Sequence, residues 1–272
     1  AAHPIVQEGV PFEFPYLSEI SKPTPEETPM KILVMGHATG GKSVGLRNLP
    51  SPEGVLVFNT EDKDFPLAGY TVVNIRTPKD LLDFLSDIIA DPDTYEHIHT
   101  IVLDSITYLL PMYERSIKHI TGFDFWNMYA EFYTKLMEML TDTHCHIIVT
   151  GHLDARANKH EQITEYLVPV KGANKVKGIE ASFTTCLYAC KRTIDELEDH
   201  SNEMLRATKH ERTTGIKNVY VTLPTEDYSE MRIRSMPGAF ASTQTYINND
   251  MGIVYQRTLT ASERQADTFD EY

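Results

Sequence analysis

The feature that most constrains the fold is a glycine-rich loop that directly follows a short apolar run. Residues 32–35 are Ile-Leu-Val-Met, and residues 36–43 are Gly-His-Ala-Thr-Gly-Gly-Lys-Ser. The spacing Gly-x-x-x-x-Gly-Lys-Ser after a strand is typical of a loop whose backbone N–H groups close around phosphates. Residues 44–49 predict the start of a helix, so we expect the order strand, loop, helix.

The residue types in this loop predict a site for ATP and Mg²⁺. Glycines let the backbone approach the phosphates, Lys42 reaches the β- and γ-phosphates, and the Ser43 hydroxyl is a magnesium ligand. We read His37 and Thr39 as spacers without a chemical role. The residues expected to contact the nucleotide are Gly36, His37, Ala38, Thr39, Gly40, Gly41, Lys42, Ser43 and Val44.

The pattern beyond the loop predicts an α/β fold. Nearly continuous apolar runs at 55–58, 72–75, 98–103 and 146–150 predict strands. Helical spacing predicts helices that open at Thr77-Pro78 and that cover about 106–119 and 125–141. Alternation of such strands with helices predicts a mostly parallel sheet with helices on both faces. Residues 184–191 and 218–223 predict antiparallel strands that extend the sheet.

Three regions follow from this reading. Residues 1–29 contain six prolines and predict an extended arm. Residues 30–225 predict the ATPase core, within which the pattern loosens into a polar segment at 153–165. Residues 226–272 predict a C-terminal extension, and the acids from about residue 261 onward predict a disordered acidic tail.

Composition sets the remaining expectations. No stretch approaches the roughly 18 apolar residues of a membrane span, and the three cysteines lack disulfide or metal-ligand spacing. We therefore expect a cytoplasmic protein with buried thiols and no membrane partner. The net charge of −14 argues against a surface that binds nucleic acid throughout. Two local basic segments remain, residues 206–217 and the group Lys171, Lys175 and Lys177, and each is either a solvated face or a binding patch.

Three further residues stand at expected strand ends, where the ligands of open α/β sheets bind. Asp104 ends the run 101–103 and is the predicted second magnesium ligand, while Ser105 follows where many P-loop ATPases carry glutamate. Glu61, just past 55–58, is a candidate to orient or deprotonate the attacking water, or else a solvated loop acid beside Asp62 and Asp64. His152 is a candidate sensor of the γ-phosphate, or else a bystander.

Together these motifs resemble the RecA-like ATPase core in its minimal, phage-encoded form. The matching segments are Gly36–Ser43, Phe58–Glu61, Ile101–Ser105, Ile148–His152 and the Lys-Gly-x-x-x-x-Lys-Gly of residues 171–178. The resemblance covers roughly residues 30–225. The family comprises phage ATP-binding proteins, some of which act as single-strand annealing proteins or recombinases.

The resemblance implies residue roles. Glu61 falls at the position of the catalytic glutamate, and His152 falls where RecA itself has a glutamine that couples the γ-phosphate to the DNA loops. Residues 153–165 correspond to the first DNA-facing loop and 169–177 to the second loop and the stretch after it. Lys175 and Lys177 would then reach ATP in a neighbouring subunit, whereas an alternative reading gives Lys171, Lys175 and Lys177 to DNA phosphates.

The leading hypothesis is an ATPase that binds single-stranded DNA and promotes annealing or strand exchange. Its expected partners are single-stranded DNA, further copies of itself in a ring or filament, and a single-strand-binding protein recruited by the tail. If the chain is phage-encoded, it acts in the host bacterial cytoplasm. Two alternatives stay open: a P-loop kinase for a nucleotide or other small molecule, and an assembly protein that binds ATP with little turnover.

Overall fold

The computed structural model describes residues 15–24, 27–158, 163–171 and 178–270, without the side chains of 158, 163 and 263–270. Its main element is an eight-stranded sheet in the order β10-β9-β8-β1-β5-β4-β2-β3. The six strands from β8 to β3 run parallel, and β9 and β10 are antiparallel additions at one edge. The strands are β1 (Lys31–Gly36), β2 (Val55–Asn59), β3 (Thr71–Asn74), β4 (Thr100–Asp104), β5 (His146–His152), β8 (Thr185–Thr193), β9 (Ile216–Val221) and β10 (Tyr246–Asn248).

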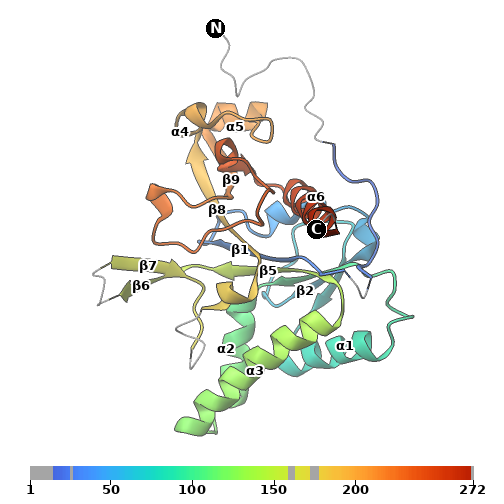
Figure 1. Cartoon of the computed structure of the whole chain (residues 1–272). Coiled ribbons are helices and arrows are strands. Elements are labelled where there is room, and N and C mark those ends of the chain that lie inside the picture. Colours follow the sequence, from blue (N-terminus) through green and yellow to red (C-terminus); the bar gives the residue numbers. More distant parts are fainter. Residues whose placement is uncertain (1–14, 25–26, 159–162, 172–177, 271–272) are drawn as a thin grey trace.

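Helices cover both faces of this sheet, as predicted. Figure 1 shows α1 (Pro78–Ala90), α2 (Ile106–Ser116) and α3 (Phe123–Asp142) gathered on one side and α6 (Met251–Asp270) on the other. Short helices α4 (Ile194–Leu197) and α5 (Lys209–Thr214) lie near the β8–β9 connection. Within the described residues, no helix has the length and hydrophobicity that crossing a membrane requires.

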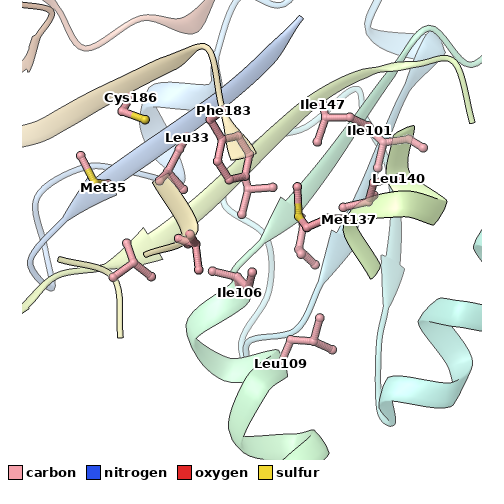
Figure 2. Close-up of a cluster of buried hydrophobic side chains, with 14 of the residues drawn as sticks. Leu33, Met35, Ile101, Ile106, Leu109, Met137, Leu140, Ile147, Phe183 and Cys186 are labelled. Atoms are coloured by element: carbon pink, nitrogen blue, oxygen red, sulfur yellow. The ribbon is translucent and has the colours of Figure 1, made fainter. Parts of the chain in front are cut away.

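Alternation along the strands produces two hydrophobic layers. In β1, Leu33 and Met35 face the α1–α3 layer, whereas Ile32 and Val34 face the layer that includes α6. Figure 2 shows part of the first layer, where Leu33 and other sheet residues meet Ile106 of α2 and Met137 of α3. Because the sheet is buried on both faces, its strand ends are held at fixed positions.

The first predicted helix is well defined by its cap. The Thr77 side chain accepts a hydrogen bond from the Asp80 backbone N–H, and the Asp80 carboxylate accepts one from the Thr77 N–H. Pro78 occupies the first turn, where its missing N–H removes no helical hydrogen bond. The predicted start at Thr77-Pro78 is therefore confirmed. The three cysteines are buried and free of disulfides, which confirms the prediction of buried thiols.

The helix predicted at 44–49 is wrong. Val44–Leu46 forms one 3-10 turn, after which the chain leaves helical geometry. Asn48 and Ser51 adopt φ values of 60° and 43°, and prolines follow at 50 and 52, so an α-helix cannot continue. A helix N-terminus after the loop would favour phosphate charge, and here only a single turn follows it.

Two other segments differ from expectation. The polar segment after residue 153 forms an antiparallel hairpin, β6 (Asp154–Asn158) and β7 (Ile163–Leu167), which stands away from the main sheet (Figure 1). The disordered tail predicted from residue 261 is wrong through Asp270, because α6 continues to that residue. No glycine or proline occurs after Gly252, and the sequence there is rich in good helix formers such as Ala, Glu, Gln and Arg.

Candidate nucleotide and metal site

Four adjacent parallel strands deliver the predicted site residues to one rim of the sheet. The order β1-β5-β4-β2 places the glycine loop after β1, Asp104 at the end of β4 and Glu61 two residues beyond β2. The loop residue Gly36 and His152 are paired at the ends of β1 and β5. Residues up to 116 positions apart in sequence thus converge because parallel strands end at the same edge.

The glycine loop is packed tightly against β8. A Cβ atom at Gly36 would lie 2.5 Å from the Ala189 carbonyl oxygen, and one at Gly40 would lie 2.6 Å from the same atom. Real Cβ atoms do not approach an oxygen that closely, so both positions require glycine. The path of the loop backbone is therefore fixed by its packing against β8.

Lys42 is buried at the centre of the loop. Its Nζ donates hydrogen bonds to the carbonyl oxygens of Gly36, at 3.0 Å, and His37, at 2.9 Å. Burial lowers the pKa of Lys42 to about 8, although the charges of Glu61 and Asp104 oppose that shift. The ammonium group is thus positioned in a poorly solvated site where an anionic ligand restores its preference for the charged form.

Ser43, Asp104 and Thr150 form an oxygen-rich group next to Lys42. The carboxylate of Asp104 is 2% exposed and accepts hydrogen bonds from the hydroxyls of Thr150 and Ser43. Burial raises the pKa of Asp104, and these two hydrogen bonds partly offset the effect. A buried carboxylate beside a P-loop hydroxyl suits Mg²⁺, which prefers oxygen ligands and usually takes one or two from protein and the rest from phosphate and water.

The described residues contain no group of three or more His, Cys, Asp or Glu side chains arranged to hold a metal ion by themselves. Ser43 and Asp104 offer two oxygen ligands, the number that Mg²⁺ usually takes from protein when phosphates and water supply the rest. These are the two residues that the sequence predicted for that role.

Glu61 is ionised and lies between two side chains, the ammonium group of Lys63 and the imidazole of His152. Its carboxylate pairs with the Lys63 ammonium group, and its Oε1 lies 3.5 Å from His152 Nε2. These hydrogen bonds, that of His152 first, lower the pKa of Glu61 to about 2 in spite of its burial. A buried, charged carboxylate at this rim is not a solvated loop acid, unlike Asp62, whose side chain is 99% exposed.

Asn59 and Thr60 position Glu61, although sequence reasoning assigned no role to either residue. The Asn59 side chain donates to the Lys63 carbonyl oxygen at 2.8 Å and accepts from the Glu61 N–H at 3.1 Å, which fixes the turn. The Thr60 N–H donates a hydrogen bond to the Asp104 carbonyl oxygen at the end of β4. The Thr60 hydroxyl donates to the Ser105 carbonyl oxygen and accepts from the Ser105 N–H. The one feature of the sequence that could have identified them is that these two polar residues directly follow the apolar run 55–58.

Lys42, Ser43, Glu61 and His152 line one cavity of about 400 Å³. The sequence predicted seven of its residues, namely Thr39, Gly41, Lys42, Ser43, Val44, Glu61 and His152. Lys191 of β8 and Asn218 of β9 also line it, and no local motif marks them. The cavity therefore joins the P-loop to strands more than 140 residues further along the chain.

The remaining predicted residues are less tightly linked to this cavity. Lys171 forms an ion pair with Glu114 of α2, and Lys175 and Lys177 lie outside the described residues. His37, read as a spacer, makes edge-on ring contacts with Tyr166 of β7 and Tyr188 of β8. That contact links the glycine loop to the β6–β7 hairpin.

The chain matches a known protein family. The model of the family described as AAA domain matches residues 28–228, about three quarters of the chain. The matched range contains the glycine loop, Glu61, Asp104 and His152. No curated protein matches the chain at a significant level.

Proposed function

The chain belongs to the AAA domain family of P-loop ATPases, and from that membership we propose that it binds and hydrolyses ATP in the cavity at the sheet rim. The observation that carries this proposal is the convergence of Lys42, Ser43 and Glu61 on one cavity of about 400 Å³, with Asp104 hydrogen-bonded to Ser43. Each group has a distinct task in phosphoryl transfer to water, and none is far from the others.

Each of these residues has its own role in ATP hydrolysis. Lys42 exchanges its carbonyl contacts for the β- and γ-phosphates, where its charge stabilises the transition state. Ser43 and Asp104 would hold Mg²⁺, which neutralises charge on the phosphates when it is bound. Glu61 orients a water molecule and accepts its proton as the water oxygen attacks the γ-phosphorus. The bond from that phosphorus to the β–γ bridging oxygen then breaks, which yields ADP and phosphate.

Separate measurements of binding and turnover test this proposal. Lys42→Ala should lose nucleotide binding, because it removes the buried cation. Glu61→Gln should bind ATP as the wild type does but lose turnover by roughly 10²-fold or more, since general-base catalysis is typically worth that factor. Normal phosphate release by Glu61→Gln would contradict the assignment of Glu61. Transfer of phosphate to an added nucleotide rather than to water would favour a kinase.

For the finer function, we propose a RecA-like ATPase that acts on single-stranded DNA as an oligomer and promotes annealing or strand exchange. The support is the link between the cavity and the β6–β7 hairpin. His152 ends β5, β6 begins two residues later, and His37 contacts Tyr166 of β7 with ring centroids 5.9 Å apart. Loss of the γ-phosphate could thus alter the hairpin by two routes: through His152, which leads into β6, and through the contact between His37 and Tyr166 of β7.

DNA-stimulated ATP turnover at low salt tests this second proposal. The net charge of −14 makes local cations necessary for any DNA contact, and Lys171 would have to leave Glu114 to take part. Single-stranded DNA should bind in a salt-sensitive manner and raise turnover. If it does neither, the DNA proposal fails while the ATPase proposal stands.

A further inference from the structure

The β8–β9 strand pair borders the glycine loop with side chains that have no assigned role. Lys191 of β8 and Asn218 of β9 are paired in the antiparallel register, so their side chains lie on the same face of the sheet. Ala189, two residues before Lys191, lies on that face as well and touches Gly36 and Gly40. Lys191 and Asn218 therefore lie side by side on the sheet face that borders the glycine loop, one step along β8 from Ala189.

Contacts at Gly41 show how close this row lies to the phosphate-binding backbone. A Cβ atom at Gly41 would be 3.3 Å from both Cγ and Nδ2 of Asn218. Gly41 has φ +89°, a conformation that favours glycine. The Asn218 side chain thus packs directly on the loop residue that precedes Lys42, and Asn218 Oδ1 is buried without a hydrogen-bond partner among the described residues.

Lys191 differs from Lys63 and Lys217 in that no acidic partner among the residues that the structure describes neutralises its charge. Lys63 pairs with Glu61, and Lys217 pairs with Glu211. Lys191 is exposed and makes no ion pair within the described part of the chain. Its neighbour Arg192 donates to the Tyr228 hydroxyl instead. Lys191 is therefore a cation at the cavity wall whose charge is not neutralised by the protein.

We infer that Lys191 and Asn218 complete the nucleotide site from within the same chain. Lys191 supplies a second cation to the phosphate chain of a bound nucleoside triphosphate, and the Asn218 Nδ2 amide donates a hydrogen bond to a phosphate oxygen beside Gly41. This inference rests on the proposed nucleotide binding. Its physical basis is that the Lys191 ammonium group and the Asn218 amide, whose Nδ2 lies beside Gly41, share a cavity with the P-loop lysine, where charge-assisted donation to phosphate oxygens is strong.

Nucleotide affinity in matched variants tests the inference. Lys191→Met should weaken Mg·ATP binding roughly tenfold or more, because a hydrogen bond to a charged group is typically worth at least that factor. Lys191→Arg keeps the charge and should bind within about threefold of the wild type. Lys118→Met removes an exposed lysine of the α2–α3 connection and is the control. Asn218→Ala should also weaken binding, by less than Lys191→Met.

The outcomes separate this inference from the proposed function. Melting of the nucleotide-free Lys191 variants should match the wild type, since Lys191 is exposed, so a loss of affinity in them is not a loss of fold. Wild-type affinity in Lys191→Met, alongside lost binding in Lys42→Ala, would overturn the inference and leave the nucleotide site intact. Equal weakening in Lys191→Met and Lys118→Met would overturn it too, because it would show a general charge effect. A wild-type protein that binds no nucleotide would overturn both.

Discussion

His152 Nε2 lies 3.5 Å from Glu61 Oε1, so the last residue of β5 contacts the carboxylate that follows β2. The two strands are not neighbours, because β4 with Asp104 lies between them. A contact that spans β4 joins the proposed general base to the residue that leads into the hairpin. Glu61 is thus positioned by the element that would respond to the γ-phosphate.

Removal of His152 should impair Glu61 rather than ATP binding. In His152→Ala, Glu61 loses the hydrogen bond that contributes most to its low pKa, so turnover should fall about tenfold with little change in affinity. His152→Gln keeps a neutral donor and should retain more activity. The pH profile checks the mechanism: wild-type Glu61, with a pKa of about 2, stays ionised at pH 5, whereas the acid limb of His152→Ala should move upward.

ATP affinity should decline as the pH rises above about 8. Burial lowers the pKa of Lys42 to about 8, so free Lys42 loses its proton above that pH, and ATP must then bind together with proton uptake. Affinity should fall by up to about tenfold per pH unit. Lys42→Arg, which remains protonated, should bind with no such dependence. A titration from pH 7 to 9.5 that shows constant wild-type affinity would contradict this account of Lys42.

Gly45→Ala should destabilise the protein, and Tyr220→Phe should restore part of the loss. A Cβ atom at Gly45 would overlap the buried Tyr220 hydroxyl oxygen and crowd the Asn249 side chain. That hydroxyl has no hydrogen-bond partner among the described residues, so Tyr220→Phe alone should be neutral or stabilising. Denaturant unfolding of the two single variants and the double variant measures the coupling. Additive effects would show that the two groups do not meet.

Tyr16→Phe should lower the free energy of unfolding by about 0.5–1.5 kcal/mol, the usual value of one hydrogen bond. The Tyr16 hydroxyl donates to the buried Asp250 carboxylate at 2.7 Å, just before α6. This contact holds the end of the predicted N-terminal arm against its own chain. Urea unfolding of Tyr16→Phe, with the exposed Tyr108→Phe as control, is the measurement, and equal stability of the two variants would contradict the role of this contact.

Local signals in the sequence were sufficient for most of the fold. Continuous apolar runs identified β2, β4 and β5, and the Thr77-Pro78 cap identified the start of α1, because burial and capping are properties of neighbouring residues. The turn at 44–51 depends on positive φ at Asn48, where the adjacent Arg47 carbonyl accepts from Gly252 of α6. Such a conformation is imposed by tertiary packing, so a helix was the wrong prediction.

The site residues, too, divide into those that local sequence signals mark and those that only the tertiary structure brings together. Lys42, Asp104 and Glu61 were predictable because each follows a strand, and parallel strands end at one rim. Asn218 and Lys191 were not, since no local motif marks either residue: Lys191 lies on β8 next to β1, and Asn218 comes beside it because β9 pairs antiparallel with β8. His152 became more than a lone loop histidine only when the strand order placed it against Glu61.

The most direct measurement of the central claim is a crystal structure with Mg²⁺ and a non-hydrolysable ATP analogue. We predict the triphosphate inside the residue 36–43 loop, with Lys42 Nζ on the β- and γ-phosphates and Mg²⁺ coordinated through Ser43 and Asp104. Glu61 should face the water in line with the γ-phosphorus. A triphosphate bound elsewhere, or a metal that avoids both Ser43 and Asp104, would contradict the account.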